Sequence, residues 1–331
     1  MKRALVTGIT GQDGQYLAEY LNSREYEVFG LLHGQANPKA DVIRSTFPFV
    51  ELIGGDLADL SSLIAAVETV QPDEVYNMGA ISFVALSFKQ PELTSNVTGL
   101  GVLRLLEAIR VVGGMENNPI RFYQASSSEM FGQVRESPQT EKTPFHPRSP
   151  YGVAKVFGHH TTVNYRESYG LYAVSGICFN HESPRRGLEF VTRKVTNGVA
   201  RIKFGLQTEL VMGNLDAQRD WGFAGDYAAA MWLSLQQPQA DDYVVATGET
   251  HSVREMIEAA FRAAGIEDWE TYIRVDDRYK RPADVEYLVG DATKARDVLG
   301  WKPQVSFEEL MTMMVEADLE LVQKETRRGN A

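Results

Sequence analysis

The sequence is poor in cysteine, because Cys178 is the one cysteine among 331 residues. A single thiol excludes an internal disulfide framework and is typical of the reducing cytoplasm, which is the location we predict. Cys178 lies in the apolar run 174–179, so we expect a small buried core residue rather than a nucleophile.

Long apolar runs are also missing. No stretch approaches the length of a membrane-spanning helix, and the apolar segment 3–6 is shorter than a secretory signal. We therefore expect no membrane partner.

Positive charge is scarce as well, with 33 Lys and Arg against 44 Asp and Glu, a formal charge of −11. This balance argues against nucleic acid as a partner. An anion could still bind where cations converge, and the candidates all lie in the second half: Arg185, Arg186, Arg193, Lys194, Arg219 and Arg281.

Strand-like and helix-like segments alternate over the first half, as in a parallel sheet wrapped by helices. We predict strands at 3–7, 27–32, 50–54, 73–78, 121–126 and 172–179, and helices at 13–24, 59–70, 91–112 and 151–169. After residue 180 we expect helices at 190–204, 225–236, 252–264 and 306–322, with a strand at 209–212. The predicted class is α/β: a Rossmann-type doubly wound parallel sheet (1–180) with a smaller mixed α/β substrate-binding lobe (181–331, interleaved with the first).

A glycine-rich segment follows the first strand. Gly8, Gly11 and Gly14 permit a tight turn in which the backbone approaches a pyrophosphate at a helix N-terminus. A plain tight turn is the alternative, but the position at the first strand-to-helix turn favours a dinucleotide site. A dinucleotide site here would include Gly8, Thr10, Gly11, Gln12, Asp13 and Gly14.

Two further segments bear on the dinucleotide. Asp56 and Leu57 follow the third strand, where they could meet an adenine edge, although Asp56 could equally cap the next helix. The second strand ends in neither the acidic residue that binds ribose hydroxyls nor the arginine that binds a 2′-phosphate. His33 or Lys39 could meet a phosphate, so the choice between NADP and NAD stays open.

Tyr151 and Lys155 are the strongest catalytic candidates. A four-residue step on a helix places both side chains on one face, and we expect the ammonium to lower the pKa of the phenol. A base of this kind can remove a proton from a sugar hydroxyl. Ser127, at the end of the fifth strand, could hold that hydroxyl, and Glu129 adds a carboxylate acid or base. We expect no metal.

These motifs resemble those of the extended short-chain dehydrogenases/reductases and, more narrowly, of the GDP-mannose 4,6-dehydratase family. The matching segments cover nearly the whole chain: 7–14 (TGITGQDG), 147–151 (PRSPY), 164–170 (NYRESYG), 179–187 (FNHESPRRG), 190–194 (FVTRK), 213–222 (GNLDAQRDWG), 281–283 (RPA) and 299–303 (LGWKP).

The resemblance implies an internal redox cycle that ends in a 4-keto-6-deoxy sugar without net use of cofactor. Tyr151 would take the C4 hydroxyl proton, and Lys155 would bind the nicotinamide ribose. Glu129 would remove the C5 proton, after which water leaves from C6 and the stored hydride returns to C6. The NADP, or NAD, would stay bound.

The resemblance also assigns binding residues. The cofactor would contact Ser82, His181 and Arg186. The GDP-sugar would contact Ser87, Asn180, Val191, Lys194, Gly213, Asn214, Arg219, Arg281 and Asp284. It further implies a homodimer formed through the helices at 91–112 and 151–169, or a homotetramer.

The sequence departs from the family pattern at four places. Ser127 stands where threonine is usual, Ile81 where glutamine is usual, and Asp284 where glutamate is usual. Residues 33–37 replace the basic segment that in the family contacts the 2′-phosphate and helps build a tetramer. Ser127 keeps open a second interpretation, a GDP-4-keto-6-deoxy-mannose reductase.

The sequence is also compatible with three further functions. One is a dehydratase of a related GDP-sugar such as a manno-heptose, and another is a C4 epimerase, which would not need Glu129. The third is a cofactor-sensing protein without catalysis.

Overall fold

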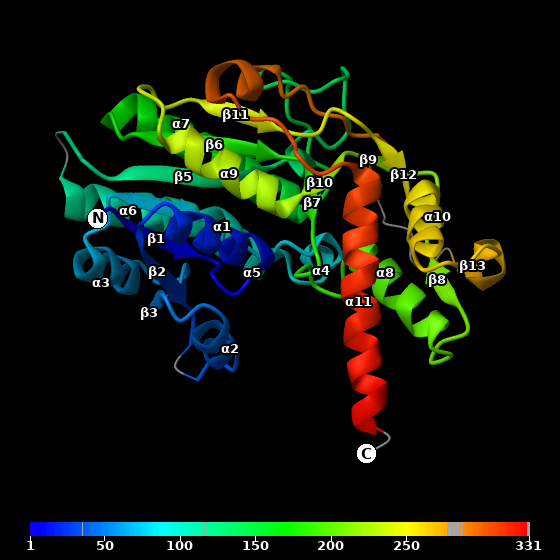
Figure 1. Ribbon diagram of the computed structural model, residues 1–331. Helices are drawn as coiled ribbons and strands as arrows, with labels where there is room; N and C mark the ends of the chain where they lie inside the picture. The colour runs from blue at the N-terminus through cyan, green and yellow to red at the C-terminus, as the bar shows by residue number, and fades with distance from the viewer. Residues whose placement is uncertain (35, 115–116, 277, 279–284, 286, 330–331) are drawn as a thin grey trace.

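The computed structural model describes residues 1–34, 36–114, 117–276, 278, 285 and 287–329, and it is built around one parallel sheet (Figure 1). The strand order is β11-β6-β5-β4-β1-β2-β3, and every neighbouring pair is parallel. The bounds are β1 Arg3–Thr7, β2 Glu27–Leu32, β3 Val50–Gly54, β4 Glu74–Asn77, β5 Arg121–Ser127, β6 Ala173–Cys178 and β11 Asp242–Val245. The predicted Rossmann-type sheet is confirmed.

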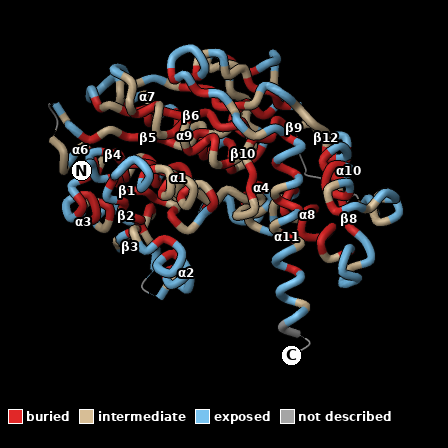
Figure 2. The backbone as a smooth tube through the Cα atoms, viewed as in Figure 1, coloured by how far each residue is buried: buried red, intermediate tan, exposed pale blue. Residues whose placement is uncertain are grey.

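Successive side chains of these strands enter two different cores, because strand side chains alternate between the faces of a sheet. In β1, Ala4 and Val6 pack with α1 (Gln12–Ser23) and α9 (Ala224–Leu235). Leu5 joins the opposite core, under the helices α3 (Leu60–Val70), α6 (Gly101–Gly113) and α7 (Pro150–Tyr169). Both layers are buried where they meet the sheet (Figure 2).

The six predicted strands are all present, but the seventh strand, β11, was not predicted. Its four residues carry too short a periodic pattern to stand out, and only the neighbouring β6 makes them a strand. The helix expected at 225–236 is α9, and it packs on the central sheet beside α1 rather than in the smaller lobe. The chain thus returns to the first lobe after residue 181, and a division at residue 180 stays a prediction.

Several short elements surround the sheet. The segment expected as one helix over 91–112 is α5 (Pro91–Thr94), a π-helical turn η1 (Ser95–Leu100) and α6 in succession. Two helices were not predicted, α2 (Lys39–Thr46) and α4 (Val84–Lys89). Among the described residues, no helix has the length and apolarity needed to cross a membrane.

The smaller lobe is formed by α8 (Val191–Lys203), α10 (Val253–Ala263) and α11 (Phe307–Gly329), which share one apolar core (Figure 1). α11 is longer than expected. Three two-stranded pairs accompany these helices among the described residues: β7 (Asn180–Glu182) with β10 (Trp221–Phe223), β9 (Gln218–Arg219) with β12 (His251–Ser252), and β8 (Leu210–Met212) with β13 (Ile273–Val275).

A buried ion pair joins α8 to α11. The Arg193 guanidinium donates to both Asp318 carboxylate oxygens, at 3.0 and 2.7 Å, and also to the carbonyls of Pro184 and Arg186. Thr196 donates a further hydrogen bond to Asp318. Arg193 was a candidate anion-binding residue. Its guanidinium instead binds Asp318 and the backbone carbonyls of the 184–186 loop, and these bonds hold that loop in place.

Candidate functional site

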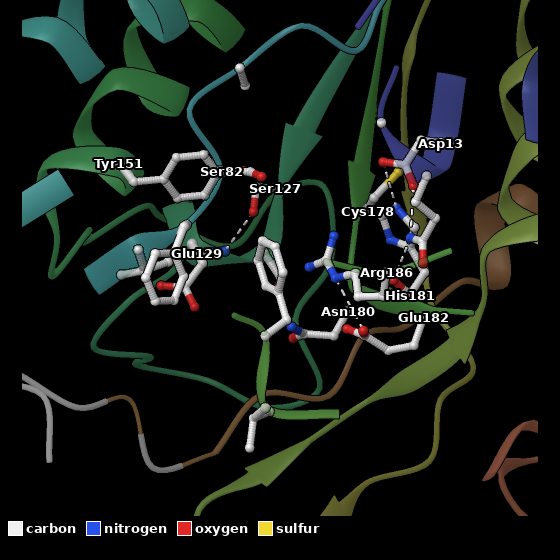
Figure 3. A pocket seen from close by; sticks show the side chains of 18 of the residues that line it. Asp13, Ser82, Ser127, Glu129, Tyr151, Cys178, Asn180, His181, Glu182 and Arg186 are labelled. Carbon is white, nitrogen blue, oxygen red and sulfur yellow. Dashed lines mark hydrogen bonds and ion pairs between the residues drawn. The ribbon is translucent and has the colours of Figure 1, made fainter. Parts of the chain in front are cut away.

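A cleft of about 570 Å³ lies where the carboxyl ends of β1, β4, β5 and β6 meet the smaller lobe. Ligands of doubly wound sheets bind at this position. The cleft brings together most of the predicted residues: Gly8, Thr10, Gly11, Gln12, Asp13, Gly14, Ser82, Ser127, Glu129, Tyr151, Lys155, Asn180, His181, Arg186, Val191, Lys194, Gly213, Asn214 and Arg219. Figure 3 shows Tyr151, Ser127 and Glu129 on one side and Asp13 and His181 on the other.

The glycine-rich turn is built for close approach of the backbone. Gly8 has φ +68°, which favours glycine, and a Cβ on Gly14 would lie 2.4 Å from the Gly8 carbonyl oxygen. This close packing sets the start of α1 directly against the turn after β1, and the first N–H groups of a helix, which have no partner within the helix, suit a pyrophosphate. The residues present fit a dinucleotide.

The start of α1 is fastened to the segment 180–183. Gln12 donates to the His181 carbonyl at 3.0 Å and accepts from Ser183 at 2.7 Å. His181 Nε2 lies 3.1 Å from Asp13 Oδ2, and its Nδ1 lies 2.7 Å from the Phe179 carbonyl. Burial alone would lower the pKa of His181 and raise that of Asp13, but their pairing outweighs it and shifts both pKa values the other way. Both shifts favour the charged forms of the pair.

Arg186 lies over the Phe190 ring, with 3.6 Å from the guanidinium carbon to the ring centroid. Its Nε is 3.1 Å from Glu182 Oε2, and Thr192 donates a 2.5 Å hydrogen bond to the same oxygen. This arrangement fixes the guanidinium at the cleft wall, where it can bind a phosphate or ribose oxygen.

Tyr151 is buried at the start of α7, where Ser149 caps the helix and Pro150 is its first residue. The expectation that Lys155 lowers the pKa of this phenol is wrong. Burial raises the pKa above its usual value, although a hydrogen bond with Ser127 opposes the shift, and the Glu129 carboxylate adds to it. These surroundings therefore favour the neutral phenol.

Lys155 lies on the same face of α7, as predicted, with Nζ 5.6 Å from the centre of the Tyr151 ring. The Nζ donates to the Ala125 carbonyl at 2.6 Å. Burial lowers the pKa of Lys155 to about 8, because the ammonium loses hydration that its neighbours replace only in part. The lysine can therefore exchange a proton near neutral pH.

Ser127 is the last residue of β5, and Glu129 lies in the helical turn that follows (Ser128–Met130). The Glu129 backbone N–H donates to Ser127 Oγ at 3.3 Å, and the Glu129 side chain is buried at the cleft wall (Figure 3). A hydroxyl, a phenol and a carboxylate thus face one space. Together they can hold a hydroxyl, accept its proton and act on a neighbouring carbon.

The smaller lobe contributes cations at the far end of the cleft. Lys194 Nζ donates to the Val211 carbonyl at 2.6 Å, and burial lowers its pKa. Arg219 is buried and donates to the Gln218 carbonyl at 2.8 Å. These side chains, with Gly213 and Asn214 between them in sequence, suit a diphosphate.

Three predicted residues do not line the cleft. Leu57 is buried against Gly79 and Gly101, and the Ser87 hydroxyl donates to the Val84 carbonyl at 2.7 Å. Asp56 is partly exposed and pairs with His33 at 3.1 Å. Their ligand roles stay predictions. Arg281 and Asp284 lie outside the described residues.

Sequence reasoning missed several residues of the cleft wall, notably Phe83, Glu182 and Phe190. Phe83 and Phe190 meet edge to face, with ring centroids 5.7 Å apart, across the two lobes. Glu182 and Phe190 could have been found, since they lie within the matched segments 179–187 and 190–194, whereas Phe83 lies in none of them. Lys39, considered for phosphate binding, also lines the cleft.

The chain is similar to known proteins over nearly its full length. A family model for GDP-mannose 4,6-dehydratase matches residues 5–314. GDP-mannose 4,6 dehydratase 2 of Arabidopsis thaliana is 53% identical, over 98% of this chain and 88% of that protein.

Solved structures extend the comparison. The NAD complex of the UDP-glucose 4-epimerase from Thermus thermophilus superposes with a TM-score of 0.83, at 30% identity over 96% of this chain and 98% of that chain. RMD from Pseudomonas aeruginosa, complexed with NADPH, gives a TM-score of 0.79, at 26% identity over 97% of this chain and 100% of that chain. With the glycine-rich turn, the Tyr151–Lys155 pair and Glu129 in one cleft, the chain belongs to the GDP-mannose 4,6-dehydratase family.

Proposed function

We propose that the protein dehydrates GDP-D-mannose to GDP-4-keto-6-deoxy-D-mannose. The observation that carries the proposal is the convergence of Ser127, Glu129, Tyr151 and Lys155 on one cleft that also holds a dinucleotide cradle. The Arabidopsis relative bears the name of this activity. Glu129 favours dehydration over simple epimerisation, because removal of water needs an acid or base beyond Tyr151.

Each of these side chains has a separate role in the proposed reaction. Ser127 holds the C4 hydroxyl, and Tyr151 Oη accepts its proton once the phenol is ionised. Glu129 removes the C5 proton and gives it to the departing C6 hydroxyl, and Tyr151 returns the proton it took from the C4 hydroxyl to C5 when the hydride reaches C6. A bound dinucleotide supplies the hydride acceptor at C4 and the donor at C6. Phe83 and Phe190 exclude water while the sugar is oxidised.

The assignment is tested by incubating the protein, loaded with oxidised dinucleotide, with GDP-mannose and no added reductant. We expect a product lighter by one water with no net change in the reduced cofactor. A product of unchanged mass would support an epimerase. Conversion of a GDP-4-keto-6-deoxy sugar with added NADPH, without conversion of GDP-mannose, would support the reductase. Faster turnover of a GDP-manno-heptose would move the assignment to that sugar.

Glu129→Gln is the matched variant, because it removes the carboxylate and keeps the shape. We expect kcat for dehydration to fall by roughly 100-fold or more, the usual effect of losing a general acid or base, with dinucleotide affinity unchanged. Dehydration at the unaltered rate would show that another group performs this step.

We infer that NADP is preferred over NAD. The support is that no carboxylate ends β2 and that Lys39, at the start of α2, lines the cleft on this side. Solved structures of similar chains contain either dinucleotide, NAD in the Thermus epimerase and NADPH in the Pseudomonas protein.

Lys39→Glu tests this preference. Reversal of the charge should weaken NADP binding on the order of tenfold, since an exposed ionic contact contributes about 1 kcal/mol and the new carboxylate repels the phosphate. NAD affinity should hardly change. Lys89→Glu, an exposed lysine that does not line the cleft, is the control. Equal weakening for both dinucleotides would remove Lys39 from 2′-phosphate recognition.

We also propose a homodimer, or a homotetramer built from it, through α7 and the neighbouring helical segment. Large apolar side chains are exposed there: Leu93 47%, Leu100 40%, Val153 54% and Phe157 44%. Apolar side chains gathered in this way on one surface indicate a protein interface.

Phe157→Asp should convert the assembly to monomers, because the interface would then bury an unpaired carboxylate. The measurement is mass by light scattering. Leu206→Asp alters a residue of similar exposure in the smaller lobe and should leave the mass unchanged. A Phe157→Asp variant that keeps the assembly intact would contradict this interface.

We place the protein in the cytoplasm, because its sole thiol is buried and forms no disulfide.

A further inference from the structure

Three polar side chains on one face of α7 bind successive residues at the end of β5. Tyr151 hydrogen-bonds to the Ser127 side chain, and Lys155 donates to the Ala125 carbonyl at 2.6 Å. His159 Nδ1 lies 3.1 Å from Ser126 Oγ. Tyr151, Lys155 and His159 are four residues apart, so their side chains lie on one face of α7 and all three can reach β5. His159 belongs to the same row as the catalytic pair but has no place in the reaction derived above.

The surroundings of His159 make it a fixed, neutral acceptor. Ser126 and His159 are 3% and 5% exposed. His159 Nε2 faces Asp242 Oδ2 at 3.9 Å, and Arg166 holds the Asp242 carboxylate with two hydrogen bonds of 3.0 and 2.9 Å. The carboxylate favours the tautomer with hydrogen on Nε2, so Nδ1 accepts from the Ser126 hydroxyl.

The protonation state agrees with this geometry. Burial lowers the pKa of His159 to about 4, against the attraction of Asp242, and His160 and Arg166 lower it further. Neutral imidazole therefore prevails at working pH, and Ser126 always has an acceptor. The contact also connects β5 to β11, the strand that the second half of the chain contributes.

We propose that His159 is a positioning residue, which holds the Ser126 hydroxyl and so fixes the Ala125 carbonyl and Ser127 against Lys155 and Tyr151. The assignment to catalysis rests on the proposed dehydration. Small displacements of reacting groups are costly, about 100-fold in rate for 1 Å. Ser126 lies between the two residues that the catalytic pair contacts, so a shift there moves both at once.

The test compares His159→Phe with His159→Asn. Phenylalanine fills the site but cannot accept a hydrogen bond, whereas the asparagine amide can place an acceptor near Nδ1. We expect His159→Phe to lower kcat by roughly ten- to 100-fold while KM and dinucleotide affinity change little. His159→Asn should recover most of that loss, which a role in filling space alone would not explain.

His160→Phe is the matched control, because His160 is the next residue on α7, is exposed, and packs edge to face on Phe145 and on the His159 ring. It should leave kcat unchanged. In a Ser126→Ala background, His159→Phe should cost much less than in the unaltered protein, since the two residues act through one bond. Equal costs in both backgrounds, or a normal kcat in His159→Phe, would overturn the proposal.

A second measurement needs no substrate. Nitrogen NMR of the imidazoles should show His159 neutral with hydrogen on Nε2, and Ser126→Ala should shift the Nδ1 resonance. An Nδ1–H tautomer would overturn the positioning role whatever the enzyme does. Absence of GDP-mannose turnover with the expected NMR result would instead remove the proposed function, so the two failures are distinguishable.

Discussion

Burial of polar side chains between α7 and the end of β5 is the constraint on which this site depends. Tyr151 and Lys155 are 7% and 4% exposed, and their ionised forms are poorly hydrated there. The same burial raises the pKa of the phenol and lowers that of the ammonium. These surroundings therefore favour the neutral form of each group more than water does. A ligand that brings positive charge to the phenol would shift this balance, so the base becomes effective in the loaded site.

Two ion pairs brace the segments around the cleft. The Asp13–His181 pair ties the glycine-rich turn to β7, and Arg193 and Asp318 hold the 184–186 loop from the side of α8 and α11. Because breaking either buried pair would leave an uncompensated charge, these joints resist opening. Because these pairs keep the cleft walls in place, the cleft suits a dinucleotide that stays bound while it is reduced and then reoxidised.

The sheet, and the gathering of Ser127, Glu129, Tyr151 and Lys155 at one cleft, could be predicted from the sequence because both depend on local patterns. The first six strands are long enough to show their periodicity, and the Tyr151–Lys155 spacing specifies one helix face by itself. The features that the sequence did not predict depend on contacts between segments that are far apart in the chain. β11 is a strand because β6 lies beside it, and α9 joins the main sheet because α1 lies there. The direction of the Tyr151 pKa could not follow from spacing, since desolvation outweighs any attraction along the helix. The contact of His159 with Ser126 joins residues 33 positions apart and had no local signal.

The central claim, that burial against β5 controls the ionisation of this site, can be tested on Lys155 in the ligand-free protein. The measurement is an NMR titration of the lysine Cε resonances, with the Lys155 signal identified by its loss in Lys155→Met. A buried ammonium that is poorly compensated should titrate near pH 8, where its pKa has been lowered to about 8. A midpoint at or above the ordinary lysine value of about 10.4 would contradict the account, because it would mean that the surroundings stabilise the ammonium as well as water does.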